Sequence, residues 1–165
     1  MRTISKTTLR LADEVWIITA LLHREFPLRS DFSIEEILDR ARRENLSDSL
    51  RPGFYVHVVQ HCVANRRPNP ARYRMLYETT EGRRRLFRLG DSYHSGREGS
   101  KILPAVGAIP DGYQGLVSWY HEWVSAAVAN SAATDPLLHL ANSGSQVWAD
   151  EPTDEYVRRL REGWE

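Results

Sequence analysis

Cysteine is almost absent from this 165-residue chain, which contains only Cys62. A single cysteine cannot close an intrachain disulfide, and without a CxxC pair the chain lacks the usual beginning of a structural zinc site. No apolar run approaches the roughly 18 residues that span a bilayer, so we expect no membrane insertion. The first residues, MRTISKTTLRLADE, lack the uninterrupted apolar stretch of an export signal, so we expect a cytoplasmic protein.

Catalytic motifs are missing too, since the chain has no GxSxG nucleophile elbow and no GxxxxGKS/T phosphate loop. His57 and His61 have a spacing that can bind zinc on a helix, but no Glu lies between them as in HExxH. A nuclease needs clustered carboxylates, and the only dense group fits a capping box and a solvated helix face: Asp31, Glu35, Glu36 and Asp39. We therefore expect no enzyme, no metal site and no cofactor.

The zero net charge of the whole chain hides a division of charge along it. Residues 1–97 hold 18 Lys and Arg against 12 Asp and Glu, whereas residues 98–165 hold 4 against 10. Within the first part, residues 51–97 carry 10 Arg against 3 acids, a net charge of +7. Such a local field attracts phosphate, and the acidic end of the chain can meet a different, basic partner.

Three helices are predicted in the first third of the chain. Apolar residues at helical spacing over residues 6–25 predict the first helix, which should end at Phe26-Pro27. The capping-box pattern of residues 33–36 predicts a second helix from about Ile34 to Glu44. The third helix should begin at Arg51-Pro52-Gly53, because proline is well tolerated in a first turn.

The pattern after the third helix changes and predicts a β-hairpin. Residues 73–77 and 83–88 are short runs rich in aromatic and strand-forming residues, and the turn residues 78–82 separate them. Three helices followed by a hairpin is the order of a winged helix-turn-helix, so the predicted fold class is α+β, with a winged-helix DNA-binding domain over residues 1–97. A generic small α+β domain with the same element order is the alternative.

The third helix is the predicted recognition helix for double-stranded DNA. If Tyr55, Val59 and Cys62 face the core, the opposite face lies beside Arg51 and carries four other side chains: Phe54, His57, Gln60 and His61. Gln and Arg can contact purine edges in the major groove, and the N-terminus of a helix favours a phosphate. A solvated helix face is the alternative interpretation.

Arginines crowd the predicted hairpin and the loop before it, and they are the predicted phosphate contacts: Arg66, Arg67, Arg83, Arg84, Arg85 and Arg88. Because alternate residues of a strand point to opposite faces, Arg84 and Arg88 share one face, and Arg83 and Arg85 share the other. Only some of them can contact DNA. Each phosphate contact should add about 0.9 to the logarithmic salt slope of binding.

The rest of the chain is predicted as a linker and helix over residues 98–133, followed by a C-terminal arm over residues 134–165. The apolar stripe of residues 113–130 is typical of a core or a dimer seam. The arm holds 3 Arg against 7 acids and contains large apolar side chains: Leu137, Leu138, Trp148, Tyr156, Leu160 and Trp164. Aromatic anchors are typical of a partner-binding segment. An arm that folds back on its own domain is the alternative.

Two stretches resemble known families. Residues 11–94, above all RPGFYVHVVQHCVANRRPNPARYRMLYETTEGRRRLFRLGDSYH, resemble a small prokaryotic family of winged-helix-like domains found near restriction and toxin–antitoxin systems. The tail DPLLHLANSGSQVWADEPTDEYVRRLREGWE resembles the C-terminal arm of VapB-type antitoxins. This second resemblance implies a PIN-domain ribonuclease toxin as partner, with Arg158, Arg159 or Arg161 pairing with the metal-binding carboxylates of the toxin.

The resemblance to antitoxins covers only the arm. VapB-type antitoxins usually begin with a ribbon-helix-helix or an AbrB-type hairpin, and this chain departs from both, so the operator geometry and the oligomeric state, including a homodimer, stay open. The predicted function is an antitoxin-like DNA-binding transcriptional autoregulator that neutralises its toxin through the arm. The alternative is an accessory or specificity DNA-binding module of a restriction system.

Overall fold

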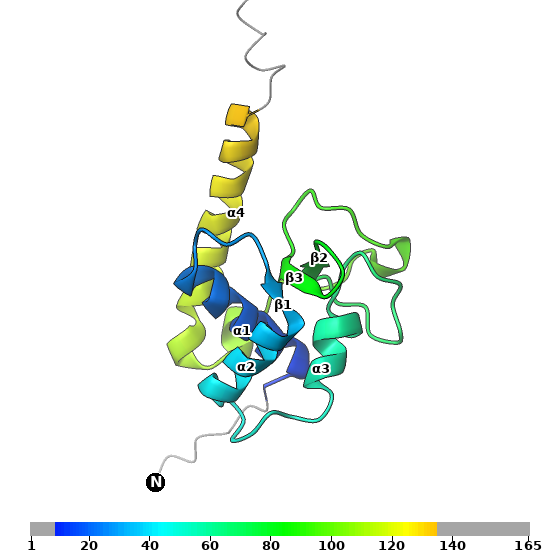
Figure 1. Ribbon diagram of the computed structural model, residues 1–165, viewed down its shortest axis with the longest axis vertical. Helices are drawn as coiled ribbons and strands as arrows, with labels where there is room; N and C mark the ends of the chain where they lie inside the picture. The colour runs from blue at the N-terminus through cyan, green and yellow to red at the C-terminus, as the bar shows by residue number, and fades with distance from the viewer. Residues whose placement is uncertain (1–8, 135–165) are drawn as a thin grey trace, which may run out of the picture. The chain divides into compact units, whose positions relative to one another are not determined.

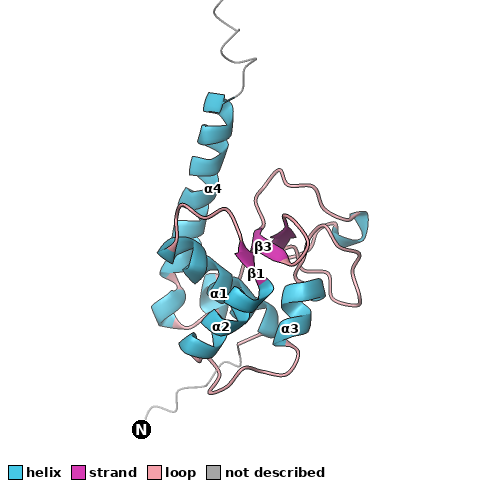
Figure 2. Ribbon diagram, in the orientation of Figure 1, coloured by secondary structure: helices cyan, strands magenta, loops and turns pink. Residues whose placement is uncertain are grey.

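The computed structural model of the chain describes residues 9–134, and the side chains of residues 9–130. Within this range the protein has four helices and a small three-stranded antiparallel sheet, so the α+β class is confirmed (Figures 1 and 2). The elements follow one another as α1 (Leu11–Glu25), β1 (Phe32–Ser33), α2 (Ile34–Glu44), α3 (Phe54–Val56), β2 (Leu76–Glu78), β3 (Arg83–Leu86) and α4 (Gly115–Thr134). A π-helical segment, His57–His61, continues α3, and we call the two together helix 3.

Helix α1 is buried on every side from Ala12 to His23 and forms the centre of the core. It begins at Leu11 rather than near residue 6, and it ends at Glu25, as the Phe26-Pro27 pair predicted. Two of its carboxylates are buried, and each forms an ion pair with a basic side chain. Asp13 pairs with Lys101 at 2.7 Å, and Glu14 pairs with Arg51 at 3.1 Å. Burial raises the pKa of Glu14, and the positive charge of Arg51 opposes that rise.

Helix α2 has the predicted bounds because its N-terminus is capped as the sequence indicates. The Ser33 hydroxyl accepts from the Glu36 amide at 3.1 Å, and the Glu36 carboxylate accepts from the Ser33 amide at 2.8 Å. Phe32 and Ile37 flank this capping box and are both fully buried, as the two members of a hydrophobic staple should be. Asn45 ends the helix in the left-handed conformation, with φ of 56°.

The sheet contains the predicted hairpin and one strand that the sequence did not predict. Strands β2 and β3 pair antiparallel, with Leu76 opposite Leu86 and Glu78 opposite Arg84. The two-residue strand β1, between α1 and α2, pairs with the other edge of β3, so the strand order is β1-β3-β2. This pairing ties the first helices to the hairpin.

Residues 98–124 belong to the same compact unit as the residues before them. Four side chains of α4 lie in the core: Leu116, Val117, Tyr120 and Val124. From Ser125 on, α4 belongs to a second unit. No helix in the part of the chain that the structure describes is long and apolar enough to cross a membrane.

His23 lies where α1, the sheet and α4 meet. Its Nε2 atom accepts from the Leu86 amide at 3.3 Å, and its ring lies 4.9 Å from that of Phe32 and 4.8 Å from that of Trp123. Burial, together with the positive charges of Arg88 and Arg85, lowers the pKa of His23 to about 3. The ring is therefore neutral at pH 7.

His23 should make stability depend on pH. The unfolded chain, with a His pKa near 6.5, takes up the proton before the folded protein does, so stability is full above about pH 6.5 and falls below it. The contribution is about 1.4 kcal/mol per pH unit. We expect the free energy of unfolding of His23→Gln to fall less between pH 7 and pH 5 than that of the wild type, by about 2 kcal/mol. Urea unfolding measures this, and equal pH slopes would contradict a neutral, buried His23.

Candidate nucleic-acid interface

Helix 3 is turned by about one residue from the predicted orientation. Phe54, Val58 and Cys62 are fully buried, four residues apart, and form its core-facing stripe. Tyr55 and Val56 are 55% and 44% exposed. The prediction that Tyr55 faces the core and Phe54 faces DNA was therefore wrong. Phe54 and Tyr55 are adjacent and both aromatic, so the spacing of apolar residues alone could not decide which of the two side chains points into the core.

The start and the end of helix 3 are both irregular. Gly53 precedes it with φ of 86°, a left-handed conformation that favours glycine. At the other end the Cys62 amide donates to the His57 carbonyl at 3.0 Å, which is the i→i+5 bond of a π-helix. The final carbonyls of a helix have no donors within it and carry the negative end of the helix dipole.

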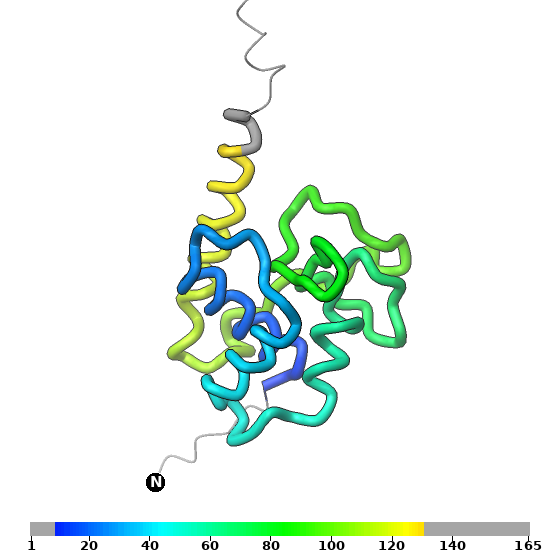
Figure 3. The backbone as a smooth tube through the Cα atoms, viewed as in Figure 1, coloured from blue at the N-terminus to red at the C-terminus, as the bar shows by residue number. Residues whose placement is uncertain are grey.

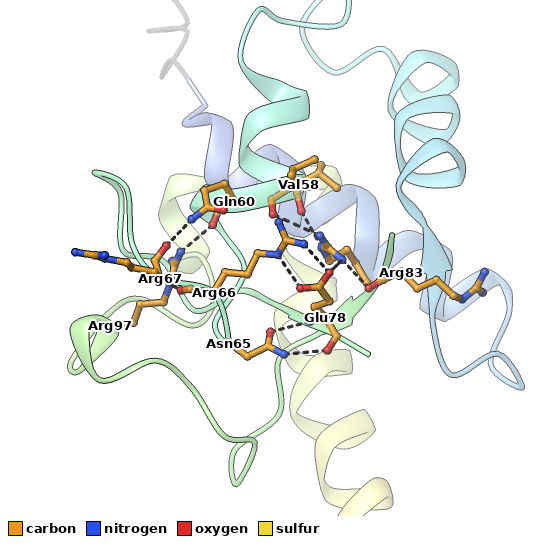
Figure 4. Close-up of polar contacts among 10 residues, drawn as sticks. Val58, Gln60, Asn65, Arg66, Arg67, Glu78, Arg83 and Arg97 are labelled. Carbon is orange, nitrogen blue, oxygen red and sulfur yellow. Dashed lines mark hydrogen bonds and ion pairs between the residues drawn. The ribbon is translucent and has the colours of Figure 1, made fainter. Parts of the chain in front are cut away.

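Two fully buried arginines hold these final carbonyls, and we call them the arginine clamp: Arg84 and Arg97. Arg84 donates to the carbonyls of Val58 and Val59 at 3.1 and 3.4 Å. Arg97 donates to the Gln60 carbonyl at 2.8 Å (Figure 4). It also donates to the His61 carbonyl at 2.8 Å. Burial lowers the pKa of both guanidinium groups from its usual value, but the carbonyl dipoles favour their positive charge.

Arg97 also fixes the loop that follows helix 3. It donates to the carbonyl of Arg66 at 2.7 Å and to that of Tyr73 at 2.6 Å, so one side chain joins both ends of the loop to the helix. The Gln60 side-chain amide donates to the Arg67 carbonyl between those ends. Figure 3 traces this loop as it leaves helix 3 and returns to the sheet.

Most of the predicted phosphate contacts are engaged inside the protein. Arg66 pairs with Glu78 at 2.7 Å, and Arg84 is buried beside the same carboxylate at 3.1 Å. Apart from Arg67, the other arginines of this group also have internal partners: Arg83 pairs with Asp31 and Arg85 with Asp91, while Arg88 lies over the Trp123 ring. Arg51, predicted beside the recognition helix, pairs with Glu14. The prediction that Arg84 contacts DNA was therefore wrong, because its side chain has no exposed surface.

Two loop arginines remain exposed, and no hydrogen bond or ion pair engages their guanidinium groups within the described residues: Arg67 and Arg72. Figure 4 shows the Arg67 side chain extending away from helix 3. Arg72 belongs to the same arginine-rich loop as Arg66 and Arg67. These two cations are free to meet an anionic partner.

The two sides of helix 3 differ in charge. On the side of α2, Tyr55 and Glu35 line a shallow hollow together with Ser33, Ile34, Leu38 and Gly82. On the side of the loop lie His57 and His61, whose rings are 4.8 Å apart, and then the two exposed arginines. An anionic ligand is therefore favoured on the loop side and disfavoured next to Glu35.

The histidines do not form part of a larger ligand cluster. His57 Nδ1 lies 2.9 Å from the Gly53 carbonyl, and burial together with the charges of His57 and Arg97 lowers the pKa of His61. Among residues 9–130 no three His, Cys, Asp or Glu side chains gather as metal ligands. Burial raises the pKa of Cys62, so its thiol stays protonated.

The clamp can be tested by removing Arg97. Arg97→Ala removes the guanidinium donor of four carbonyls; the Gln60 carbonyl keeps the Val63 amide at 3.3 Å, whereas those of His61, Arg66 and Tyr73 become orphans that cost about 1–3 kcal/mol each. We expect the free energy of unfolding in urea to fall by about 3 kcal/mol or more. The control Arg67→Ala removes an exposed arginine and should change it by less than about 0.5 kcal/mol. Equal effects of the two substitutions would show that the clamp does not stabilise helix 3.

The predicted partner-binding residues lie outside the described part of the chain: Leu137, Leu138, Trp148, Tyr156, Arg158, Arg159, Leu160 and Trp164. Comparisons of the sequence with protein-family models and curated proteins, and of the fold with solved structures, find no match.

Proposed function

We propose that this protein is a non-catalytic, DNA-binding regulator with a winged helix-turn-helix fold, and that its C-terminal arm neutralises a PIN-domain ribonuclease toxin. The observation that carries the DNA-binding half is the element order, in which three helices precede a hairpin and β1 closes the sheet on the far edge of β3. In a helix-turn-helix the second helix of the motif enters the major groove. Here α2 and helix 3 are those two helices.

The DNA-contacting surface in this proposal consists of the exposed side of helix 3 and the loop after it. Gln60, His57 and His61, from the predicted set, are partly exposed there, and Arg67 stands beside them. The proposed surface includes Arg72 and excludes Phe54 and Arg84, because these two side chains are buried. The other arginines of the predicted set do not contact phosphate in this proposal, because Arg88 lies over the Trp123 ring and the rest form ion pairs within the domain.

The protein should bind duplex DNA with a strong salt dependence. We expect binding of the full chain to a random-sequence duplex to weaken between about 50 and about 200 mM salt, because phosphate contacts release counterions. Arg67→Ala and Arg72→Ala should each lower the logarithmic salt slope by about 0.9. Arg24→Ala, which removes an exposed arginine in the last turn of α1, is the control and should leave the slope unchanged. A failure to bind DNA at low salt would refute the proposal.

The partner-binding half of the proposal is supported by the composition of the arm and by its resemblance to antitoxin arms. Residues 134–165 combine a net charge of −4 with Trp148, Tyr156, Leu160 and Trp164. Each large apolar side chain contributes about 1.5–3 kcal/mol when a groove buries it, before the cost of ordering the arm. The acidic arm and the basic loop can thus serve two different partners.

Truncation separates the two halves of the proposal. We expect a chain that ends after Ala133 to keep its affinity for DNA and to lose co-purification with the neighbouring gene product, a PIN-domain ribonuclease. In the full chain, Trp148→Ala and Leu160→Ala should weaken this capture, because each removes an apolar anchor. Capture of the toxin by the truncated chain would exclude the arm as the neutralising element, and co-purification with an endonuclease would favour a restriction-system module instead.

A further inference from the structure

Resting on the proposed DNA binding, we propose that helix 3 recognises its DNA through apolar contact with the C5-methyl groups of thymine. The two side chains that helix 3 exposes most are apolar or aromatic: Tyr55 and Val56. Val59 is half-buried one turn after Tyr55. Among the base edges of the major groove, the thymine methyl is the apolar group that such a surface can contact.

Two polar side chains of helix 3, those of Gln60 and His57, are already engaged within the protein, and so is Arg51 just before the helix. Gln60 donates its amide hydrogen to the Arg67 carbonyl, so the amide is turned toward the loop (Figure 4). His57 Nδ1 is bonded to the Gly53 carbonyl, and Arg51 donates to the Leu9 carbonyl at 2.7 Å. Bidentate contact of Gln60 with adenine, or of Arg51 with guanine, would require these bonds to break first. Apolar recognition requires no such rearrangement.

The charges around Tyr55 and Val56 also favour an orientation of the duplex in which these side chains meet the base edges. Gln60 holds the backbone of Arg67 against helix 3, so a free cation stands beside the apolar surface. On the opposite side Glu35 shares a hollow with Tyr55 and repels phosphate. When Arg67 and Arg72 bind the phosphates of one DNA strand, Val56 therefore faces the base edges of the major groove.

Replacing thymine with uracil removes only the methyl group and tests the inference directly. Duplexes selected from a random library by the full chain would be remade with each thymine replaced by uracil in turn. We expect affinity to fall about fourfold for each contacted methyl, which corresponds to the burial of one methyl-sized group. Val56→Ala should bring the thymine-to-uracil affinity ratio toward one and keep the salt slope. Val106→Ala, at a valine that is 47% exposed outside helix 3, is the matched control and should keep the ratio.

The outcomes separate this inference from the proposed function. Duplex binding with equal affinity for thymine and uracil sites, or with no enriched sequence, would overturn thymine recognition and leave DNA binding intact. An unchanged ratio in Val56→Ala would also overturn it. Absence of duplex binding at low salt would instead refute the proposed function. A lower affinity for uracil sites that Val56→Ala removes and Val106→Ala retains would establish the inference.

Discussion

The C-terminal carbonyls of helix 3 have no donors within the helix, and the arrangement of the surrounding residues follows from how they are satisfied. Arg84 reaches them from β3, and Arg97 reaches them from the segment after the hairpin. Arg97 places four of its five N–H donors on backbone carbonyls, so it can be buried without a carboxylate in that bonding set. The clamp thereby joins helix 3, the loop and the sheet through hydrogen bonds.

This use of arginine explains why the basic charge of residues 51–97 does not translate into an equally basic surface. Asp31, Glu78 and Asp91 neutralise arginines of the hairpin and the loop, and the pairing is internal to the domain. Desolvating a guanidinium is expensive unless its donors are satisfied. Buried or half-buried arginines are therefore paired with groups of the same domain, and among the described residues of the hairpin and the loop few arginines stay unpaired at the surface.

How far the sequence could predict the structure depends on the range of each interaction. The α2 helix was predicted correctly because its capping box acts within four residues, and the β2–β3 hairpin because its turn is local. By contrast, Arg83 and Asp31 lie 52 residues apart, and the carbonyls that Arg97 holds precede it by 24 to 37 residues. Charge counting identified the arginines but could not identify these partners. Strand β1, with two residues, is too short to show a pattern.

The clamp also determines which side chains remain for a ligand. Polar groups near it are drawn into internal bonds, as Gln60 is by the Arg67 carbonyl and His57 by the Gly53 carbonyl. The Val56 side chain has no polar atom with which to enter that network, and Val56 and Tyr55 stay the most exposed side chains of helix 3. Arg67 and Arg72 stay free because Arg97 binds the loop at the carbonyls of its two ends, whereas these two side chains stand between them. A surface with an apolar centre and a cationic edge is therefore the direct consequence of how helix 3 is held in place.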